Sequence, residues 1–182
     1  MTSFGSVEPL DESHSVADFE CGSTAQTAWL RNSALNAQRA GTARVFVVRA
    51  FADPEAGVQT GSPSGSVVGY YALTTGSVLH ADAPTRLTQG TGRYDVPVVI
   101  LARLGVDQNY QERGLGRALV VDAFRRVDKV AEDVGVRAML IHAEDEHALQ
   151  FYMKLAAFDA SPVDPLQIIL LMKDLRRAVK KT

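Results

Sequence analysis

Six consecutive residues, Gln111-Glu112-Arg113-Gly114-Leu115-Gly116, place two glycines at the expected start of a long helix. The first amides of a helix have no partners inside the helix and point outward, and the helix dipole adds partial positive charge there. Glycines allow a backbone to approach a bulky anion closely. The segment therefore predicts a binding site for a pyrophosphate group that needs no basic side chain.

The common nucleotide-binding motifs do not match this segment. The dinucleotide fingerprint has three glycines, of which the first is missing here, and the Gly-Lys-Ser/Thr end of a P-loop is absent. Two glycines at a helix start also occur as ordinary turn and packing residues. The segment thus disfavours hydride transfer and nucleotide hydrolysis without identifying the bound group.

The composition limits the class of protein further. The chain has 182 residues, 46% of them hydrophobic, and its 19 basic and 21 acidic side chains give a net charge of −2. At about 150 residues per domain this length predicts one domain, and the charge balance argues against broad nucleic-acid binding. The bases gather late in the chain, and the stretch 175–182 suits either a solvated helix end or a local basic patch.

Signals for metal binding, secretion or membrane insertion are absent. The single cysteine, Cys21, cannot form an internal disulfide, and Cys-based metal sites need several thiolates, so we expect no metal. The acidic N-terminal stretch lacks the basic start of a secretory signal. No run reaches the roughly 20 apolar residues that cross a bilayer. We expect a cytoplasmic protein with no membrane association.

The hydrophobic pattern predicts the helices and strands that position the glycine-containing loop. We expect helices at 23–40, 114–135 and 146–155, and strands at 44–51, 67–73, 98–106, 138–143 and 166–172. The stretches 53–66 and 80–95 are rich in Gly, Pro, Ser or Thr and are expected to be loop insertions. This order predicts an α/β fold of the α+β type, a central mixed β-sheet flanked by helices, in one domain covering residues 1–182.

The segment Gln111–Gly116 resembles the Q/R-x-x-G-x-G/A motif of the GNAT family of N-acetyltransferases. It lies between the buried strand expected at 98–106 and the long helix expected at 114–135, as the motif does in that family. The resemblance covers nearly the whole chain and implies the GNAT acyltransferase fold with acetyl-CoA as co-substrate. In that family the loop amides hold the pyrophosphate, and the preceding strand parts from its neighbour to pair with the pantetheine amides. The cofactor-binding residues implied by this resemblance are Leu104, Gly105, Val106, Gln111, Glu112, Arg113, Gly114, Leu115, Gly116 and Arg117.

Further segments resemble a subgroup of the family, the GNAT toxins of type II toxin–antitoxin modules. They are 18–22 (DFECG), 28–31 (AWLR), 38–44 (QRAGTAR), 101–107 (LARLGVD), 135–138 (GVRA) and 164–175 (DPLQIILLMKDL). These toxins acetylate the α-amine of an aminoacyl group on tRNA and so block translation, and a ribbon-helix-helix antitoxin usually neutralises them. The resemblance implies aminoacyl-tRNA as substrate, such an antitoxin as partner, and a homodimer as one option.

Acetyl transfer from a thioester to an amine requires a neutral amine, a polarised carbonyl and a proton for the leaving thiolate. We expect Tyr152 to donate that proton, because a phenol with a pKa of about 10 suits the task and the family's catalytic tyrosine occupies this place. The structural alternative is a tyrosine packed at a helix–sheet junction with its hydroxyl in water. His142 or Glu144 could deprotonate the amine, but His142 also suits a hydrogen-bonded structural role, and an α-amine beside an ester has a lowered pKa.

Several arginines are candidates for contacts with anions. Arg103 lies in an apolar strand, where it either faces the acceptor cleft or an antitoxin segment, or forms an ion pair with an acidic residue such as Glu20. The other candidates, for the 3′-phosphate of CoA or a tRNA backbone, are Arg44, Arg49, Arg113 and Arg117, and each is equally explained as a solvated charge.

The sequence predicts an acetyl-CoA-dependent N-acetyltransferase, in the main interpretation a toxin acting on aminoacyl-tRNA. One alternative keeps the chemistry with a small-molecule or protein amine as acceptor, which the net charge of −2 favours. A second alternative is a non-catalytic acyl-CoA-binding regulator. Tyr152 argues against the regulator, whereas the segment after Leu155, one residue longer than in the family and without its glycine, argues for it.

Overall fold

The helices and strands that the sequence predicts occur along the chain in the expected order. The computed structural model describes residues 3–51 and 65–181. Its strands are β1 Ser3–Phe4, β2 Glu8–Pro9, β3 Arg44–Phe51, β4 Ser66–Val78, β5 Val96–Val106, β6 Ala138–His142, β7 Asp159–Ala160 and β8 Gln167–Leu171. Its α-helices are α1 Thr24–Asn32, α2 Ala34–Ala40, α3 Thr85–Thr88, α4 Leu115–Asp133, α5 Glu146–Met153 and α6 Met172–Lys180, with 3-10 turns η2 His80–Asp82 and η3 Gln108–Tyr110.

The strands of the described residues form a mixed sheet in the order β1-β3-β4-β5-β6-β8-β7, with β2 also paired to β3. β5 and β6 run parallel, with Val98 opposite Ala138 and Leu101 opposite Ile141. β6 and β8 are antiparallel, as are the pairs β7–β8, β1–β3 and β2–β3. A parallel pair needs a long crossover, which α4 supplies between β5 and β6. The mixed sheet with helices that the sequence predicts is confirmed.

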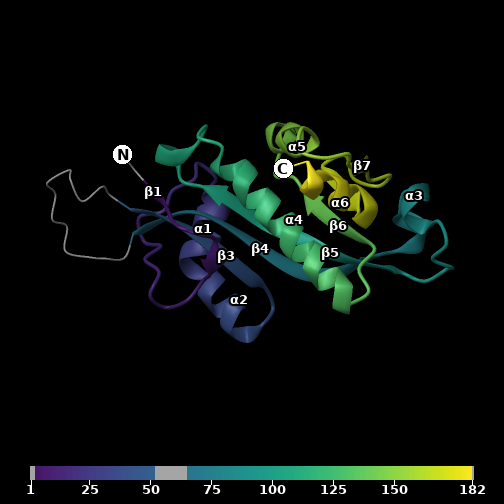
Figure 1. The fold of residues 1–182 in the computed structure, drawn as a ribbon, viewed down its shortest axis with the longest axis horizontal. Coiled ribbons are helices and arrows are strands. Elements are labelled where there is room, and N and C mark those ends of the chain that lie inside the picture. The colour runs from purple at the N-terminus through teal and green to yellow at the C-terminus, as the bar shows by residue number, and fades with distance from the viewer. Residues whose placement is uncertain (1–2, 52–64, 182) are drawn as a thin grey trace, which may run out of the picture. The chain divides into compact units, whose positions relative to one another are not determined.

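Contacts divide the chain into two compact units, residues 1–72 with 103–120 and residues 73–102 with 121–182. In the first unit α2 packs against β3 (Figure 1). The Ser23 hydroxyl accepts a hydrogen bond from Gln26 N at 3.2 Å and begins α1, and α2 ends at Gly41, whose φ of 72° is left-handed. The single helix expected at 23–40 is wrong in one respect. It breaks at Ser33, whose φ of −126° is not helical.

In the second unit β6 pairs with β8, and α6, drawn in yellow, lies beside β6 (Figure 1). Arg86 in α3 donates hydrogen bonds to Asp159 and to Asp174 of α6, each at 2.7 Å, and Asp174 is only 5% exposed. This network ties the stretch 80–95, expected as a plain loop, to the rest of its unit. The basic C-terminal stretch also belongs to a packed helix, because Leu175 of α6 is fully buried.

Other bounds differ modestly from the sequence prediction. α4 begins just after Gly114. The three- and four-residue spacing of its apolar residues predicts a buried stripe from Leu115 to Val134. Val130 and Val134 are 45% and 57% exposed, so the buried stripe stops near Val127. The short strands β1 and β2 lie in a stretch expected to be irregular. The insertion 53–66 lies almost wholly outside the described residues. Within the described ranges, no helix combines the length and apolar character needed to cross a membrane.

Candidate active site

Two residues of the Gln111–Gly116 loop adopt the left-handed backbone conformation before α4 begins. Glu112 has a φ of 59° and Gly114 a φ of 79°. Ala118 N then donates to Gly114 O at 3.0 Å, which places the unpaired amides of the first helical turn just after the glycine. A Cβ built on Gly114 would have no atom within 4 Å, and the first turn of α4 holds no acidic residue. The loop therefore leaves open, electropositive space beside its amides.

The side chain of Gln111 fixes this loop to two other segments. Its amide nitrogen donates to Val106 O at 2.9 Å and to Cys21 O at 3.0 Å. Both acceptors are carbonyls of the protein, so the amide nitrogen of Gln111 positions the loop. The second bond joins residues 90 positions apart in the chain.

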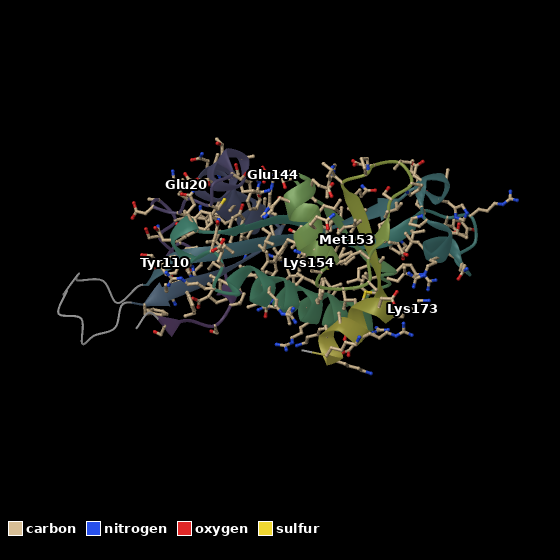
Figure 2. All side chains as sticks on the ribbon, turned by 90° about the horizontal axis from the view of Figure 1, so that it is seen from above. Glu20, Tyr110, Glu144, Met153, Lys154 and Lys173 are labelled. Atoms are coloured by element: carbon tan, nitrogen blue, oxygen red, sulfur yellow. The ribbon has the colours of Figure 1, made fainter. Side chains whose placement is uncertain are left out.

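Asp107, which no motif in the sequence marks as a site residue, completes the same anchoring. It is 6% exposed, and its carboxylate accepts hydrogen bonds from the backbone amides of Asn109 and Glu20, each at 3.0 Å. Gln108 N also donates to Glu20 O at 2.8 Å. An Asp just before a turn is a recognisable capping signal, but its bond to Glu20 has no local signature. Figure 2 labels Glu20 and Tyr110, which belong to the segments joined here.

The strand before the loop continues beyond its last pair with β6. The parallel register ends at Leu101, whereas β5 extends to Val106. Leu104 and Val106 are half-buried, and Gly105 is buried under Tyr70, because a Cβ on Gly105 would lie 2.8 Å from Tyr70 Cε1. The segment Leu104–Val106 thus stays extended past the end of the β6 ladder.

The arginines proposed as anion contacts divide into engaged and available ones. Arg49 bonds Glu8 at 2.7 Å, which makes it part of the structure of its unit. Arg113 lies over the Tyr110 ring at 5.3 Å, and Arg117 is exposed on the first turn of α4. Arg44 is exposed at the start of β3. Arg113 and Arg117 are therefore the cations that accompany the loop.

Tyr152 lies in the second unit, on the last turn of α5. Asp145 begins that helix by accepting a hydrogen bond from Ala148 N at 2.8 Å. Tyr152 is 7% exposed, and burial raises the pKa of its hydroxyl above the usual value, with the charge of Glu144 raising it further. The phenol thus holds its proton through the neutral range. In Figure 2 Glu144 precedes α5, and Met153 and Lys154 lie at its end.

The end of α5 resolves the departure from the family pattern. The helix stops at Met153, and Leu155 N donates a hydrogen bond to Tyr152 O at 2.9 Å. Phe158 is buried, and its ring centre lies 6.3 Å from that of Phe124. The chain therefore turns at once and returns to the core with Phe158, so the additional residue does not extend the helix.

His142 and Glu144 differ in their suitability as bases. His142 Nε2 lies 3.1 Å from an Asp164 carboxylate oxygen, which supports its structural role. Glu144 and His147 are exposed.

The suggested ion pair of Arg103 with Glu20 is wrong. Instead, Glu20 accepts hydrogen bonds from Gly22 N and the Thr27 hydroxyl, each at 3.0 Å, and these bonds lower its pKa.

One cavity of the second unit lies at the end of β6 opposite to His142. It measures about 350 Å³ and is lined by the segment Gly135–Arg137 together with residues of α6. That segment precedes the first residue of β6, whereas His142 is its last. No group of His, Cys, Asp and Glu side chains in the described ranges is arranged to hold a metal ion.

Comparison with known sequences places this geometry in context. The sequence model of the acetyltransferase (GNAT) family matches residues 25–158. A protein of Mycobacterium tuberculosis (strain ATCC 25618 / H37Rv) described as a tRNA-acetylating toxin is 37% identical over 179 residues, which are 98% of this chain and 99% of that protein.

Solved structures show the same fold. AtaT complexed with acetyl-methionyl-tRNAfMet has a TM-score of 0.81 at 23% identity, covering 99% of this chain and 100% of that one. A Tyr-to-Phe mutant of the AtaT toxin, bound to the C-terminus of the antitoxin AtaR and acetyl-CoA, has a TM-score of 0.75 at 20% identity, covering 98% of this chain and 99% of that one. At these identities the likeness concerns the fold.

Proposed function

The chain belongs to the acetyltransferase (GNAT) family, and from this premise we propose that it transfers the acetyl group of acetyl-CoA to the α-amine of an aminoacyl group on tRNA. The observation that carries the acetyl-CoA assignment is the open backbone of Gly114 beside the unpaired amides of α4. The choice of acceptor is supported by the 37% identity to a tRNA-acetylating toxin along nearly the whole chain.

The residues of the first unit fit acetyl-CoA. The loop amides and the exposed Arg113 and Arg117 suit a pyrophosphate, and no acidic residue occupies the first turn of α4. The extended Leu104–Val106 segment offers backbone groups to the pantetheine amides. Acetyl-CoA bound in this way supplies the acetyl thioester.

Tyr152 is the proposed acid. It holds at its Oη the proton that the thioester sulfur requires when the acetyl group leaves, and its raised pKa keeps that proton in place at neutral pH. As the amine nitrogen bonds the acetyl carbon, the bond between that carbon and the sulfur breaks and the sulfur takes the Tyr152 proton. The nitrogen loses one proton to water, and water returns one proton to the Tyr152 phenolate. No strong base is required, because an ester beside the amine lowers its pKa and His142 is already paired with Asp164.

Acetyl-CoA binding is tested with Gly114→Asp, which adds bulk and negative charge at the proposed pyrophosphate site. Gly90→Asp is a matched control, because Gly90 has a similar φ of 76° and likewise no atom within 4 Å of a built Cβ. Calorimetry should show acetyl-CoA binding by the wild type and by the control but not by Gly114→Asp. Equal binding by both variants would remove the loop from the cofactor site.

Turnover is tested with Tyr152→Phe against Tyr94→Phe, a matched change at a side chain that is 81% exposed. With labelled acetyl-CoA and aminoacyl-tRNA, the wild type and Tyr94→Phe should label tRNA. Tyr152→Phe should bind acetyl-CoA normally and lose most turnover. Unchanged turnover in Tyr152→Phe would exclude Tyr152 as the acid. If the wild type acetylates only small-molecule or protein amines, the acceptor belongs to that other class. If the wild type binds acetyl-CoA without turnover, the protein is an acyl-CoA-binding regulator.

The remaining parts of the proposal follow from the same family context. We assign residues 1–182 to one catalytic domain, which the family match across both units supports. A ribbon-helix-helix antitoxin is the proposed partner, supported by the AtaT structure with the antitoxin AtaR. The proposal includes action in the cytoplasm, where charged tRNA is found, block of translation as its result, and a homodimer. Co-expression with the adjacent gene product and sedimentation of the purified complex test the partner and the assembly.

A further inference from the structure

Arg103 is a half-buried cation in β5, between exposed Ala102 and half-buried Leu104. Its guanidinium carbon lies over the ring of Trp29, 5.6 Å from the ring centre. Within the described part of the chain Arg103 takes part in no ion pair, whereas Arg49 and Arg86 each bind carboxylates. Arg103 therefore carries a charge that no acidic side chain of its surroundings balances.

Trp29 is a rigid support for this guanidinium. Its ring stacks on Tyr70 at 6.0 Å with an interplanar angle of 15°. Tyr70 is fully buried, its hydroxyl donates to Gln26 O at 2.8 Å, and Phe19 packs edge-on against its ring at 5.5 Å. Since each ring is fixed by the next, Trp29 can hold the planar head of Arg103 in one position.

Glu20, the acidic partner suggested for Arg103 by the sequence, forms its hydrogen bonds with other residues. The Glu20 carboxylate accepts hydrogen bonds from Gly22 N and Thr27, which stabilise its charge without Arg103. The ring of Trp29 contacts the guanidinium through its face, whereas the N–H donors lie in the guanidinium plane. Those donors are consequently available to an anion from outside the chain.

The position of Arg103 along β5 suggests which anion this is. The proposed pyrophosphate site follows β5 in the chain, and the proposed pantetheine segment Leu104–Val106 precedes that site. Arg103 directly precedes this segment and so lies at its end remote from the pyrophosphate site. The acetyl end of the co-substrate would therefore lie beside it. In an aminoacyl-tRNA the reacting amine is attached through an ester to the terminal ribose, and the nearest anion is the phosphodiester of that nucleotide.

We propose that Arg103 binds the phosphodiester adjacent to the aminoacylated ribose and thereby selects tRNA-linked amines over free ones, with Trp29 as its positioning residue. A guanidinium matches phosphate with two parallel hydrogen bonds, which a lysine cannot reproduce. This inference rests on the proposed function, since it names a contact for the tRNA acceptor.

The test compares steady-state kinetics of the wild type, Arg103→Met and Arg103→Lys on aminoacyl-tRNA. Losing a charged hydrogen-bond pair should raise the KM for aminoacyl-tRNA about 10- to 100-fold in Arg103→Met, with the KM for acetyl-CoA unchanged. The KM of Arg103→Lys for aminoacyl-tRNA should lie between those of the wild type and Arg103→Met. The matched control is Arg31→Met, which removes an exposed charge from α1 and should leave both KM values near those of the wild type.

Salt dependence separates a phosphate contact from a structural effect. If Arg103 neutralises one phosphate, the slope of log KM for aminoacyl-tRNA against log salt should decrease by roughly 0.7 to 0.9 in Arg103→Met. Trp29→Leu should raise the KM for aminoacyl-tRNA less than Arg103→Met does and keep the salt slope, because the charge remains but is no longer held.

The outcomes distinguish this inference from the proposed function. If the wild type does not acetylate aminoacyl-tRNA, the proposed function fails and the inference fails with it. If the wild type is active and Arg103→Met retains both its KM for aminoacyl-tRNA and its salt slope, only the role of Arg103 is overturned. A selective rise in the KM for aminoacyl-tRNA with a reduced slope would establish the contact.

Discussion

Gly105→Ala should destabilise the protein although it adds only one methyl group. The new Cβ would lie 2.8 Å from Tyr70 Cε1 and 3.3 Å from Phe19 Cζ. Neither ring can move away easily, since Tyr70 is fully buried and anchored through its hydroxyl to Gln26 O, and Phe19 is 2% exposed. The clash must instead displace β5 or distort the aromatic stack.

Overpacking of this kind costs about 1 to 3 kcal/mol of unfolding free energy. For a chain of this length each kcal/mol corresponds to about 2–4 °C in Tm, so Gly105→Ala should lower the Tm by roughly 2–12 °C. Because Gly105 belongs to the proposed pantetheine segment, displacement of β5 should also weaken acetyl-CoA binding.

The assay is calorimetric unfolding of Gly105→Ala beside Gly135→Ala. Gly135 has no positive φ, and a Cβ built on it would have no atom within 4 Å, so alanine there should be neutral or stabilising by up to about 1 kcal/mol. Equal melting temperatures for the two variants would refute the argument that Tyr70 closes the space above Gly105.

Three further predictions follow from contacts within each unit. Glu144→Gln should lower the pKa of Tyr152, since it removes a negative charge that disfavours the phenolate; an unchanged ultraviolet titration of the phenol would contradict this. Gln111→Leu removes the hydrogen bonds that join the loop to Val106 and Cys21, and it should weaken acetyl-CoA binding measured by calorimetry. Unchanged binding would mean that the loop keeps its position without these bonds. Arg86→Ala should speed amide hydrogen exchange in residues 80–95, whereas Arg93→Ala, at an exposed arginine, should not.

The parts of the fold that depend on residues close together in the chain can be predicted from the sequence. Ser23 begins α1 through a bond to an amide three residues away, and Gly41 ends α2 because it can adopt a left-handed φ. The same local logic located the loop at Gly114 and the start of α4 directly after it. Element order then predicted the mixed sheet, since the helix between β5 and β6 permits a parallel pair.

The partners of individual side chains were decided only by the tertiary structure. Hydrophobic periodicity predicts Val134 on the apolar stripe of the helix expected at 114–135, yet its side chain is 57% exposed. Charge chemistry suggested Glu20 as the partner of Arg103, but Glu20 bonds Gly22 and Thr27 while Arg103 lies over Trp29. Sequence patterns state which groups need a partner, not which distant segment brings one.

The loop itself shows where the two kinds of information meet. Its glycines and its place at a helix start are written in consecutive residues, and these determine that its amides are unpaired. Its position depends on Gln111, whose amide bridges Val106 and Cys21, the latter 90 residues away. A bond across that separation leaves no periodicity or spacing in the sequence, because it exists only after the chain has brought the two segments together.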